Sequence, residues 1–223
     1  MSFCEQARRE TDFYWKASLR HPFVLGIANG TLPLEKFKFY MLQDAYYLKH
    51  YTKILAMLAA KAAETEDVEY FLEAARFVHE AELDLHRTTF RALQISEEEW
   101  RGFEPAPAAY NYVSHMYRAL FTGTLADAYA AILPCPWLYQ EIGAALRGAR
   151  PGVELYQQWI DLYASEELEH KIARQKAMMD RFASMPGNDE RTLDEYFRRS
   201  CYYEWQFWEM AWTYQDWKRE VYA

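Results

Sequence analysis

The sequence contains few of the residues that turn or end a chain. Its 223 residues include 8 glycines and 8 prolines, well below the roughly 12% that these two types usually contribute together. Because glycine and proline interrupt regular structure, their scarcity favours long elements. No segment shows sustained alternation of apolar and polar residues with β-branched enrichment. The sequence therefore predicts an all-α fold.

Cysteine is equally scarce, with only Cys4, Cys135 and Cys201 in the chain. An odd number at wide spacing indicates a reducing compartment rather than a disulfide framework, and no cysteine pair has the spacing of a zinc site. The first ten residues carry charges where a signal peptide has an apolar run, and no stretch is apolar enough for a bilayer. We expect a cytoplasmic protein with no membrane partner.

An excess of positive charge is also missing. Lysine and arginine number 25 against 33 aspartates and glutamates, a formal net charge of −8, and the basic residues are dispersed, which excludes nucleic acid as a partner. Hydrophobic residues make up 51% at a mean hydropathy of −0.42, a balance that excludes disordered and membrane proteins. Without repeats, low-complexity tracts or linkers, residues 1–223 are predicted to form one domain.

Aromatic residues, in contrast, are abundant. The chain has 18 tyrosines, 8 tryptophans and 13 phenylalanines, more rings than a helical core of this size normally needs. We interpret the excess as a pocket that binds a ring, as subunit contacts, or as both.

Apolar residues recur every three or four positions in several long segments, the pattern of buried helical faces. Gly123 followed by Thr124 predicts a helix end and a new cap, Ser165 predicts another cap, and Ser96 with Glu99 has the capping-box spacing. Long helices of this kind favour a bundle. The predicted helices begin after Gly30 near Pro33 and then occupy about 68–93, 108–122, 125–148, 153–163, 165–182 and 189–217.

Carboxylates interrupt two of these apolar faces. Asp44 lies three or four residues from Tyr40 and Tyr47, on the same face of its predicted helix. Glu204 shares a helical face with Ser200 and with apolar residues in the same way. A carboxylate that faces a core must find a partner or shift its pKa, so each is a candidate functional group. The alternative is a structural ion pair. Glu82 also falls on an apolar face, but its helix is charged throughout, and we assign it a structural role.

Cys135 lies between Pro134 and Pro136 inside an apolar helical run. Proline removes a backbone hydrogen bond and clashes with the preceding turn, so this pair predicts a distorted helix that exposes the thiol to a cavity. A buried cysteine is otherwise an inert small hydrophobe. The distortion makes Cys135 a candidate nucleophile, whereas Cys4 and Cys201 lack this context and are interpreted as structural.

Five segments resemble the TenA (thiaminase II) family, in the same order along the chain. They are DAYYLKHY at 44–51, YNYVSHMYR at 110–118, LPCPWLYQEIG at 133–143, WIDLYASEE at 159–167 and YYEWQFW at 202–208. The Pro-Cys-x-Trp segment is the most specific of them and indicates the cysteine-containing branch. Pro136 occupies its variable position, where it can alter the local bend.

The resemblance implies a heme-oxygenase-like helical bundle, usually a homotetramer, that binds the aminopyrimidine half of thiamin. It implies that Cys135 is the nucleophile, that Glu204 assists proton transfer at the pyrimidine, and that Asp44 recognises the ring nitrogen and exocyclic amine. Tyr47 would stack on the ring. Three further tyrosines would line the site: Tyr112, Tyr139 and Tyr163.

The implied reaction is hydrolysis of a C–N bond in thiamin salvage. The thiolate adds to the pyrimidine, a group leaves the attached methylene, and water replaces it. The products are hydroxymethylpyrimidine and either ammonia, from aminomethylpyrimidine, or the thiazole, from thiamin. No metal or redox cofactor is required, and the absence of a glycine-rich phosphate loop agrees with an unphosphorylated substrate.

Two other classes of protein remain open at this point. Helical bundles also hold di-iron sites, and Glu167 with His170, or His79 with Glu82 and His86, offer part of the required ligand set. A second complete Glu-x-x-His pair cannot be assigned, so we expect these histidines to be surface or structural residues. The remaining alternative is a non-catalytic pyrimidine-binding regulatory protein, which would not need Cys135.

Overall fold

The computed structural model describes residues 1–217, with the side chains of 81–86 left out. This part of the chain forms twelve helices and no strand, which confirms the all-α prediction. The helices are α1 (Phe3–Glu10), α2 (Asp12–Leu19), α3 (Pro22–Asn29), α4 (Leu34–Lys61), α5 (Thr65–Ala92), α6 (Glu97–Arg101), α7 (Pro107–Thr122), α8 (Leu125–Ile132), α9 (Pro134–Leu146), α10 (Glu154–Tyr163), α11 (Glu166–Ala183) and α12 (Glu190–Thr213).

The long helices begin and end close to the predicted positions, with two corrections. The helix predicted over 125–148 is divided between α8 and α9 at Leu133. The last helix was predicted to reach 217 but ends at Thr213, because Tyr214 adopts a left-handed conformation with φ of 53°. Three helices in the first thirty residues were not predicted, since eight residues are too few to show a clear period.

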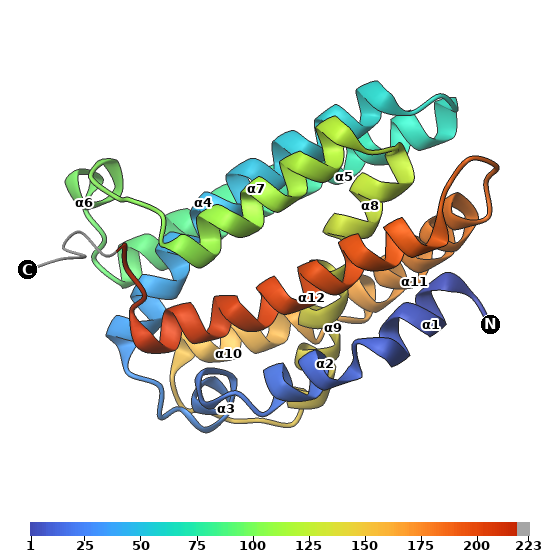
Figure 1. Cartoon of the computed structure of the whole chain (residues 1–223). Helices are drawn as coiled ribbons and strands as arrows, with labels where there is room; N and C mark the ends of the chain where they lie inside the picture. The colour runs from blue at the N-terminus through green and yellow to red at the C-terminus, as the bar shows by residue number, and fades with distance from the viewer. Residues whose placement is uncertain (218–223) are drawn as a thin grey trace, which may run out of the picture.

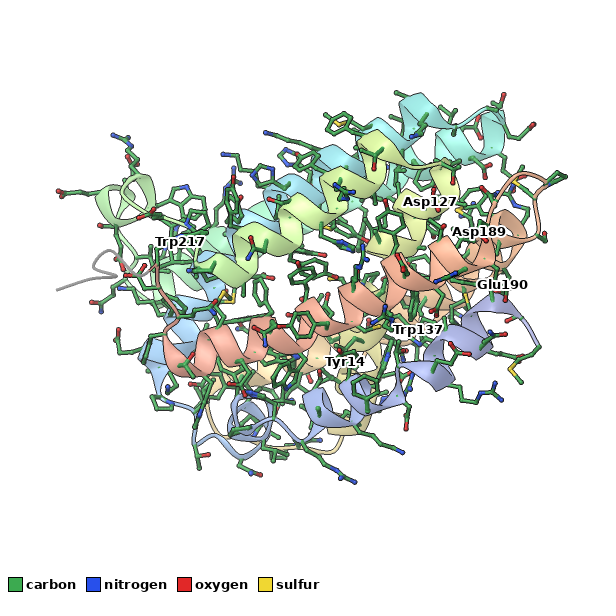
Figure 2. All side chains as sticks on the ribbon, in the orientation of Figure 1. Tyr14, Asp127, Trp137, Asp189, Glu190 and Trp217 are labelled. Atoms are coloured by element: carbon green, nitrogen blue, oxygen red, sulfur yellow. The ribbon has the colours of Figure 1, made fainter. Side chains whose placement is uncertain are left out.

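Side-chain caps define the helix ends that the sequence marked. Thr124 accepts a hydrogen bond from Asp127 N, and Asp127, labelled in Figure 2, accepts one from Thr124 N at 2.7 Å. Ser165 caps α11 as predicted. Ser96 caps α6, but the Glu99 carboxylate pairs with Lys38 Nζ at 3.0 Å instead of completing the capping box.

The helices lie in two layers joined by a short pair (Figure 1). Helices α4, α5 and α7 run together along one side, and α12 runs along the other with α10 and α11 behind it. Helices α8 and α9 pass between the layers, and α12 contacts both of them as well as α2, α4 and α7. Helix α12 is therefore the element on which most of the bundle packs. Among the described helices, not one combines the length and apolar character that a membrane crossing requires.

Aromatic rings fill the space between the layers. Trp15, Trp208, Tyr40, Tyr112 and Tyr156 are among the largest side chains with no more than 1% of their surface exposed. Neighbouring aromatic rings in the core meet mainly edge to face or tilted. These are the geometries that ring quadrupoles favour. Part of the aromatic excess therefore forms the core itself.

Trp137 illustrates how this aromatic core supports α9. Its ring lies between α12 and the N-terminal helices (Figure 2), with its centroid 5.2 Å from that of Trp15 and 6.0 Å from that of Phe197. The residue two positions earlier is Cys135. Packing of Trp137 thus anchors the turn of α9 that carries the candidate nucleophile.

Helices α9 and α10 meet with their backbones in contact at Gly143. A Cβ atom at this position would lie 2.2 Å from the backbone carbon of Tyr163. Only glycine permits this approach, which brings the ring centroids of Tyr139 and Tyr163 to 4.8 Å. The close contact therefore links the packing of two helices to the position of two predicted site residues.

Gly143→Ala is expected to destabilise the protein by about 1–3 kcal/mol, because the backbones must separate to admit one methyl group. Gly148→Ala is the matched control, since nothing lies within 4 Å of a Cβ atom at Gly148. It should change the free energy of unfolding by less than about 0.5 kcal/mol. Urea titration of both variants at one protein concentration measures the difference, and equal midpoints would contradict the close-contact argument.

Candidate active site

The two prolines of the predicted distortion end one helix and begin another. Helix α8 ends at Ile132, Leu133 makes the connection, and α9 begins with Pro134, Cys135 and Pro136. Proline suits the first helical turn, whose N–H groups have no intrahelical partner. The arrangement places Cys135 in the first turn of α9.

Side chains from other helices satisfy carbonyl groups at this junction. Pro136 has no N–H with which to bond Ile132 O, and the Tyr51 hydroxyl lies 3.5 Å from that oxygen. Ser200 Oγ donates to Ala131 O at 2.7 Å. The α8–α9 junction beside Cys135 is therefore held from both layers, by α4 through Tyr51 and by α12 through Ser200.

A buried carboxyl group lies next to the thiol. Glu204 is 2% exposed and accepts a hydrogen bond of 2.6 Å from the Tyr112 hydroxyl. Burial raises the pKa of Glu204 to about 7, against the hydrogen bonds from Tyr112 and Cys135, which lower it. A carboxyl group with this pKa both accepts and donates protons near neutral pH.

The Cys135 thiol is held in its protonated form at rest. Burial raises its pKa well above the ordinary value, and the charge of Glu204 adds to the effect. The Tyr47 hydroxyl acts in the opposite direction and lowers the pKa. Attack by sulfur therefore requires that the thiol proton move to a neighbouring acceptor, and Glu204 is in hydrogen-bond contact with the thiol.

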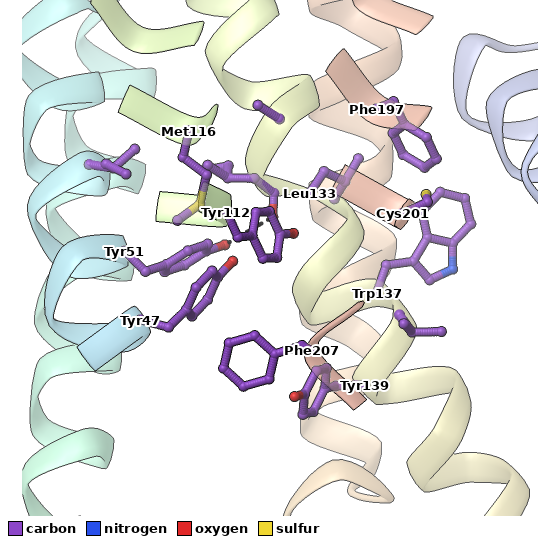
Figure 3. Close-up of a cluster of buried hydrophobic side chains, with 14 of the residues drawn as sticks. Tyr47, Tyr51, Tyr112, Met116, Leu133, Trp137, Tyr139, Phe197, Cys201 and Phe207 are labelled. Atoms are coloured by element: carbon purple, nitrogen blue, oxygen red, sulfur yellow. Dashed lines mark hydrogen bonds between the residues drawn. The ribbon is translucent and has the colours of Figure 1, made fainter. Parts of the chain in front are cut away.

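The predicted residues line two connected spaces. The first, here called the inner recess, is lined by Asp44, Tyr47, Tyr112, Cys135, Tyr139, Glu204 and Phe207. It has a volume of about 10 Å³ and is nearly filled by its own walls. Figure 3 shows Tyr47 and Tyr51 extending from α4 toward Tyr112, with Phe207 and Tyr139 below them. The Tyr47 and Tyr112 ring centroids are 5.0 Å apart.

The second space, here called the outer chamber, begins at the boundary of the inner recess. It shares Asp44, Cys135 and Tyr139 with the recess, has a volume of about 210 Å³ and is lined mainly by apolar side chains. Tyr163 lies in the outer chamber and not in the recess. Six of the seven predicted residues therefore meet in the recess, and Tyr163 faces the boundary from the other side.

Asp44 supplies negative charge at this boundary. It is 5% exposed, and its charge raises the pKa of Tyr139 and Tyr163 in addition to the effect of their burial. Tyr139 Oη is 3.1 Å from Tyr40 Oη, and Trp159 Nε1 donates to Tyr40 at 3.3 Å. A carboxylate among neutral hydroxyl groups can bind the adjacent donors of a heterocyclic amine.

Tyr47 carries a buried hydroxyl group with no hydrogen-bond partner in good geometry among the described atoms. A buried hydroxyl that lacks a partner costs free energy, so such groups are informative where they face a cavity. Tyr47 lines the inner recess beside Cys135. The group is available to a ligand or to the sulfur during reaction.

Sequence reasoning missed several contributors to the site, among them Phe207, Tyr51 and Pro136. Phe207 forms an apolar wall of the recess, Tyr51 and Pro136 line the outer chamber, and none had been assigned a role there. Phe207 lies three residues after Glu204, so helical spacing was a usable signal. The contact of Tyr51 with the α8–α9 junction depends on tertiary packing and had no such signal.

A histidine between α7 and α12 lies next to the Tyr112–Glu204 contact. His115 Nε2 lies 3.0 Å from Ser200 Oγ. Since the Ser200 hydroxyl hydrogen is given to Ala131 O, His115 is the donor in this contact. Burial lowers the pKa of His115 to about 4, which keeps the ring neutral. His115 and Ser200 lie one turn from Tyr112 and Glu204 respectively, and so hold the two helices in register.

Cys4 and Cys201 line neither of the two spaces, whereas the candidate metal ligand Glu167 lines the outer chamber. All three cysteines are unbridged, and burial raises the pKa of Cys201 to about 12. Glu167 pairs with Lys171 at 2.6 Å. Outside 81–86 and 218–223, no three histidine, cysteine, aspartate or glutamate side chains are grouped closely enough to hold a metal. The predicted structural residue Glu82 and the candidate ligand His86 lie outside the described side chains.

The model of the TENA/THI-4/PQQC family matches residues 8–214. The chain is 41% identical to the aminopyrimidine aminohydrolase of Bacillus subtilis over 218 residues, which cover 97% of this chain and 92% of that protein. A solved TenA homologue from P. horikoshii is 30% identical and superposes with a TM-score of 0.87 over 96% of this chain and 99% of that one.

The fold also matches a domain from Shewanella denitrificans that is described as having a heme oxygenase-like fold. Its TM-score is 0.74 over 95% of this chain and 92% of that one, at 14% identity, so the likeness concerns the fold alone. The predicted heme-oxygenase-like bundle is confirmed. With the family match over nearly the whole sequence, these findings establish that the chain belongs to the TENA/THI-4/PQQC family.

Proposed function

We propose that this protein is a thiamin-salvage hydrolase that converts aminomethylpyrimidine, thiamin, or both to hydroxymethylpyrimidine. The observation that carries the proposal is the buried group formed by Cys135, Glu204 and Tyr112, in which a nucleophile contacts a carboxyl group with a pKa of about 7. The name of the Bacillus subtilis relative, aminopyrimidine aminohydrolase, supports the same activity.

Substrate recognition is assigned to the boundary between the recess and the chamber. The Asp44 carboxylate accepts a hydrogen bond from the exocyclic amine and lies beside the adjacent ring nitrogen, while the ring of Tyr47 stacks on the pyrimidine. Tyr139 and Tyr163, whose ring centroids are 4.8 Å apart, border the ligand from the side of Asp44. These contacts place the ring carbon next to Cys135 Sγ.

The reaction begins when Glu204 accepts the Cys135 thiol proton. Sulfur then adds to the ring carbon, and the carboxyl proton passes to a ring nitrogen, so the ring loses its aromaticity without accumulating charge. The electron pair released from the ring amine expels the group on the methylene carbon. Water adds to that carbon, and the C–S bond breaks to restore the aromatic ring and the free enzyme. The second product is ammonia or the thiazole.

Cys135→Ala should abolish turnover and leave ligand binding largely intact, because the stacking and carboxylate contacts remain. The assay is ammonia release from aminomethylpyrimidine beside thiazole release from thiamin, with hydroxymethylpyrimidine binding measured by calorimetry. Cys4→Ala is the control and should retain activity. Near-native rates in Cys135→Ala would remove the nucleophile assignment, and binding without turnover by the unmodified protein would indicate a regulatory role.

Glu204→Gln tests the proton-transfer step. We expect kcat to fall by about 10²–10⁴-fold, the usual contribution of general acid–base catalysis. Because the ionised carboxylate accepts the thiol proton, kcat/KM of the unmodified protein should rise with pH through about 7, the pKa raised by burial, and the variant should lack this rise.

Glu195→Gln is the control for Glu204→Gln. Glu195 lies on the same helix, but its side chain is 44% exposed and pairs with Arg199. The dependence of kcat/KM on pH in the Glu195→Gln variant should match that of the unmodified protein. If Glu204→Gln changed KM alone and kept the rise near neutral pH, the acid–base role would be wrong.

The proposal includes a single domain in the cytoplasm that assembles as a homotetramer. Three unbridged cysteines are consistent with a reducing compartment. Large apolar side chains on different helices support subunit contacts, among them Phe13 and Phe121, which are 58% and 71% exposed. Light scattering at micromolar concentration should give the mass of four 26.6 kDa chains, and a monomer mass would contradict the assembly.

A further inference from the structure

We propose that the far end of the outer chamber binds the leaving group and that Phe77 makes this chain discriminate in favour of substrates whose leaving group is a flat ring. The proposal rests on the proposed function, since it assumes a pyrimidine held at Cys135. It concerns residues on α5, α10 and α11 that have no part in the steps assigned to Cys135 and Glu204.

The direction of the leaving group follows from the volumes of the two spaces. The inner recess has a volume of only about 10 Å³ between walls that include Tyr47, Tyr112 and Phe207. A substituent on a pyrimidine held at Asp44 and Cys135 cannot extend inward. The outer chamber shares both residues and offers about 210 Å³ on the other side. The methylene carbon and its leaving group therefore point into the outer chamber.

The far end of this chamber is built to hold an apolar group. Phe77 and Val78 come from α5, Leu162 from the end of α10, and Leu168 from α11. Phe77 and Leu162 are 46% and 42% exposed, so the chamber reaches the surface there. Ammonia is too small and too polar to gain from contact with these apolar side chains. A ring would cover their surface and remove it from water.

A charged neighbour lies over the ring of Phe77. Lys171 Nζ lies 3.3 Å from the centroid of the Phe77 ring, and the same ammonium pairs with Glu167 Oε1 at 2.6 Å. A cation over a ring face restrains it, so an exposed phenylalanine is presented to the chamber as a preorganised surface. The ion pair also neutralises the one cation among the described lining residues, and this favours an uncharged or cationic ring over an anionic group.

The kinetic test compares thiamin, whose leaving group is a ring, with aminomethylpyrimidine, whose leaving group is ammonia. Phe77→Ala should lower kcat/KM for thiamin about tenfold, the effect of losing one aromatic contact, and change the value for aminomethylpyrimidine less than about twofold. Phe77→Leu should restore part of the loss, since it keeps apolar surface. A fall of equal size for both substrates, or for neither, would overturn the proposal.

Leu72→Ala is the matched control, because Leu72 lies on α5, is 52% exposed and does not line the chamber. It should leave both substrates within about twofold of the unmodified protein, the size expected for a surface substitution. Light scattering of Phe77→Ala should give an unchanged mass. A changed mass together with equal losses for both substrates would assign Phe77 to a subunit contact instead.

A binding measurement separates the chamber from the proposed function. In a Cys135→Ala background, Phe77→Ala should weaken thiamin binding about tenfold and leave hydroxymethylpyrimidine binding unchanged, because only thiamin reaches the far end. If the unmodified protein turns over neither substrate but this selective loss is observed, the hydrolase function falls and the chamber assignment stands. Equal affinities for thiamin with and without Phe77 would overturn the chamber assignment even where hydrolysis is observed.

Discussion

The burial of one carboxyl group, Glu204, is the constraint around which the rest of the site is arranged. A carboxylate removed from water is costly unless it is hydrogen-bonded or protonated. The structure meets this cost in both ways, with the Tyr112 hydroxyl at 2.6 Å and a pKa raised to about 7. Tyr112 is fully buried on α7 and Glu204 on α12, so the same contact also joins two of the helices that enclose the site.

The Cys135 thiol depends on a second constraint, the interruption between α8 and α9. Two prolines within three residues cannot supply the N–H groups that a continuous helix requires. Tyr51 bonds the Ile132 carbonyl group, which Pro136 leaves without its donor, and Ser200 bonds the neighbouring carbonyl group of Ala131. Because both come from other helices, the position of the Cys135 thiol is set by the packing of the whole bundle. The position of Tyr163 also depends on helix packing, because α10 can approach α9 closely only at Gly143.

The two spaces at the site divide the chemistry by polarity. Ionisable and hydroxyl groups surround the inner recess, and a reacting ring at its boundary would exchange protons with them and form a bond to sulfur. Apolar side chains surround the outer chamber, where a leaving group would only need to be held and released. Asp44, Cys135 and Tyr139 belong to both. A substrate bound across this boundary would present different parts of its structure to each environment.

Local chemistry along the sequence determined the helical class, most of the long helices and the capped ends at Thr124 and Ser165, because scarce glycine and proline, apolar periodicity and cap residues act within one or two turns. The phase of Asp44 and Glu204 on apolar faces likewise predicted their burial, and the paired prolines predicted the distortion at Cys135. The roles of these residues came from family resemblance.

Tertiary structure alone decided what lies opposite each of these groups. Tyr112 meets Glu204 across 92 residues of sequence, Tyr51 reaches the α8–α9 junction from α4, and Tyr163 lies in the outer chamber and not in the recess. The short N-terminal helices form where Trp15 packs against Trp137. The periodicity of a helix shows which of its faces is buried. It does not show which other helix packs against that face. Partners, cavity volumes and the shifted pKa of Glu204 therefore depend on distances that only the folded bundle creates.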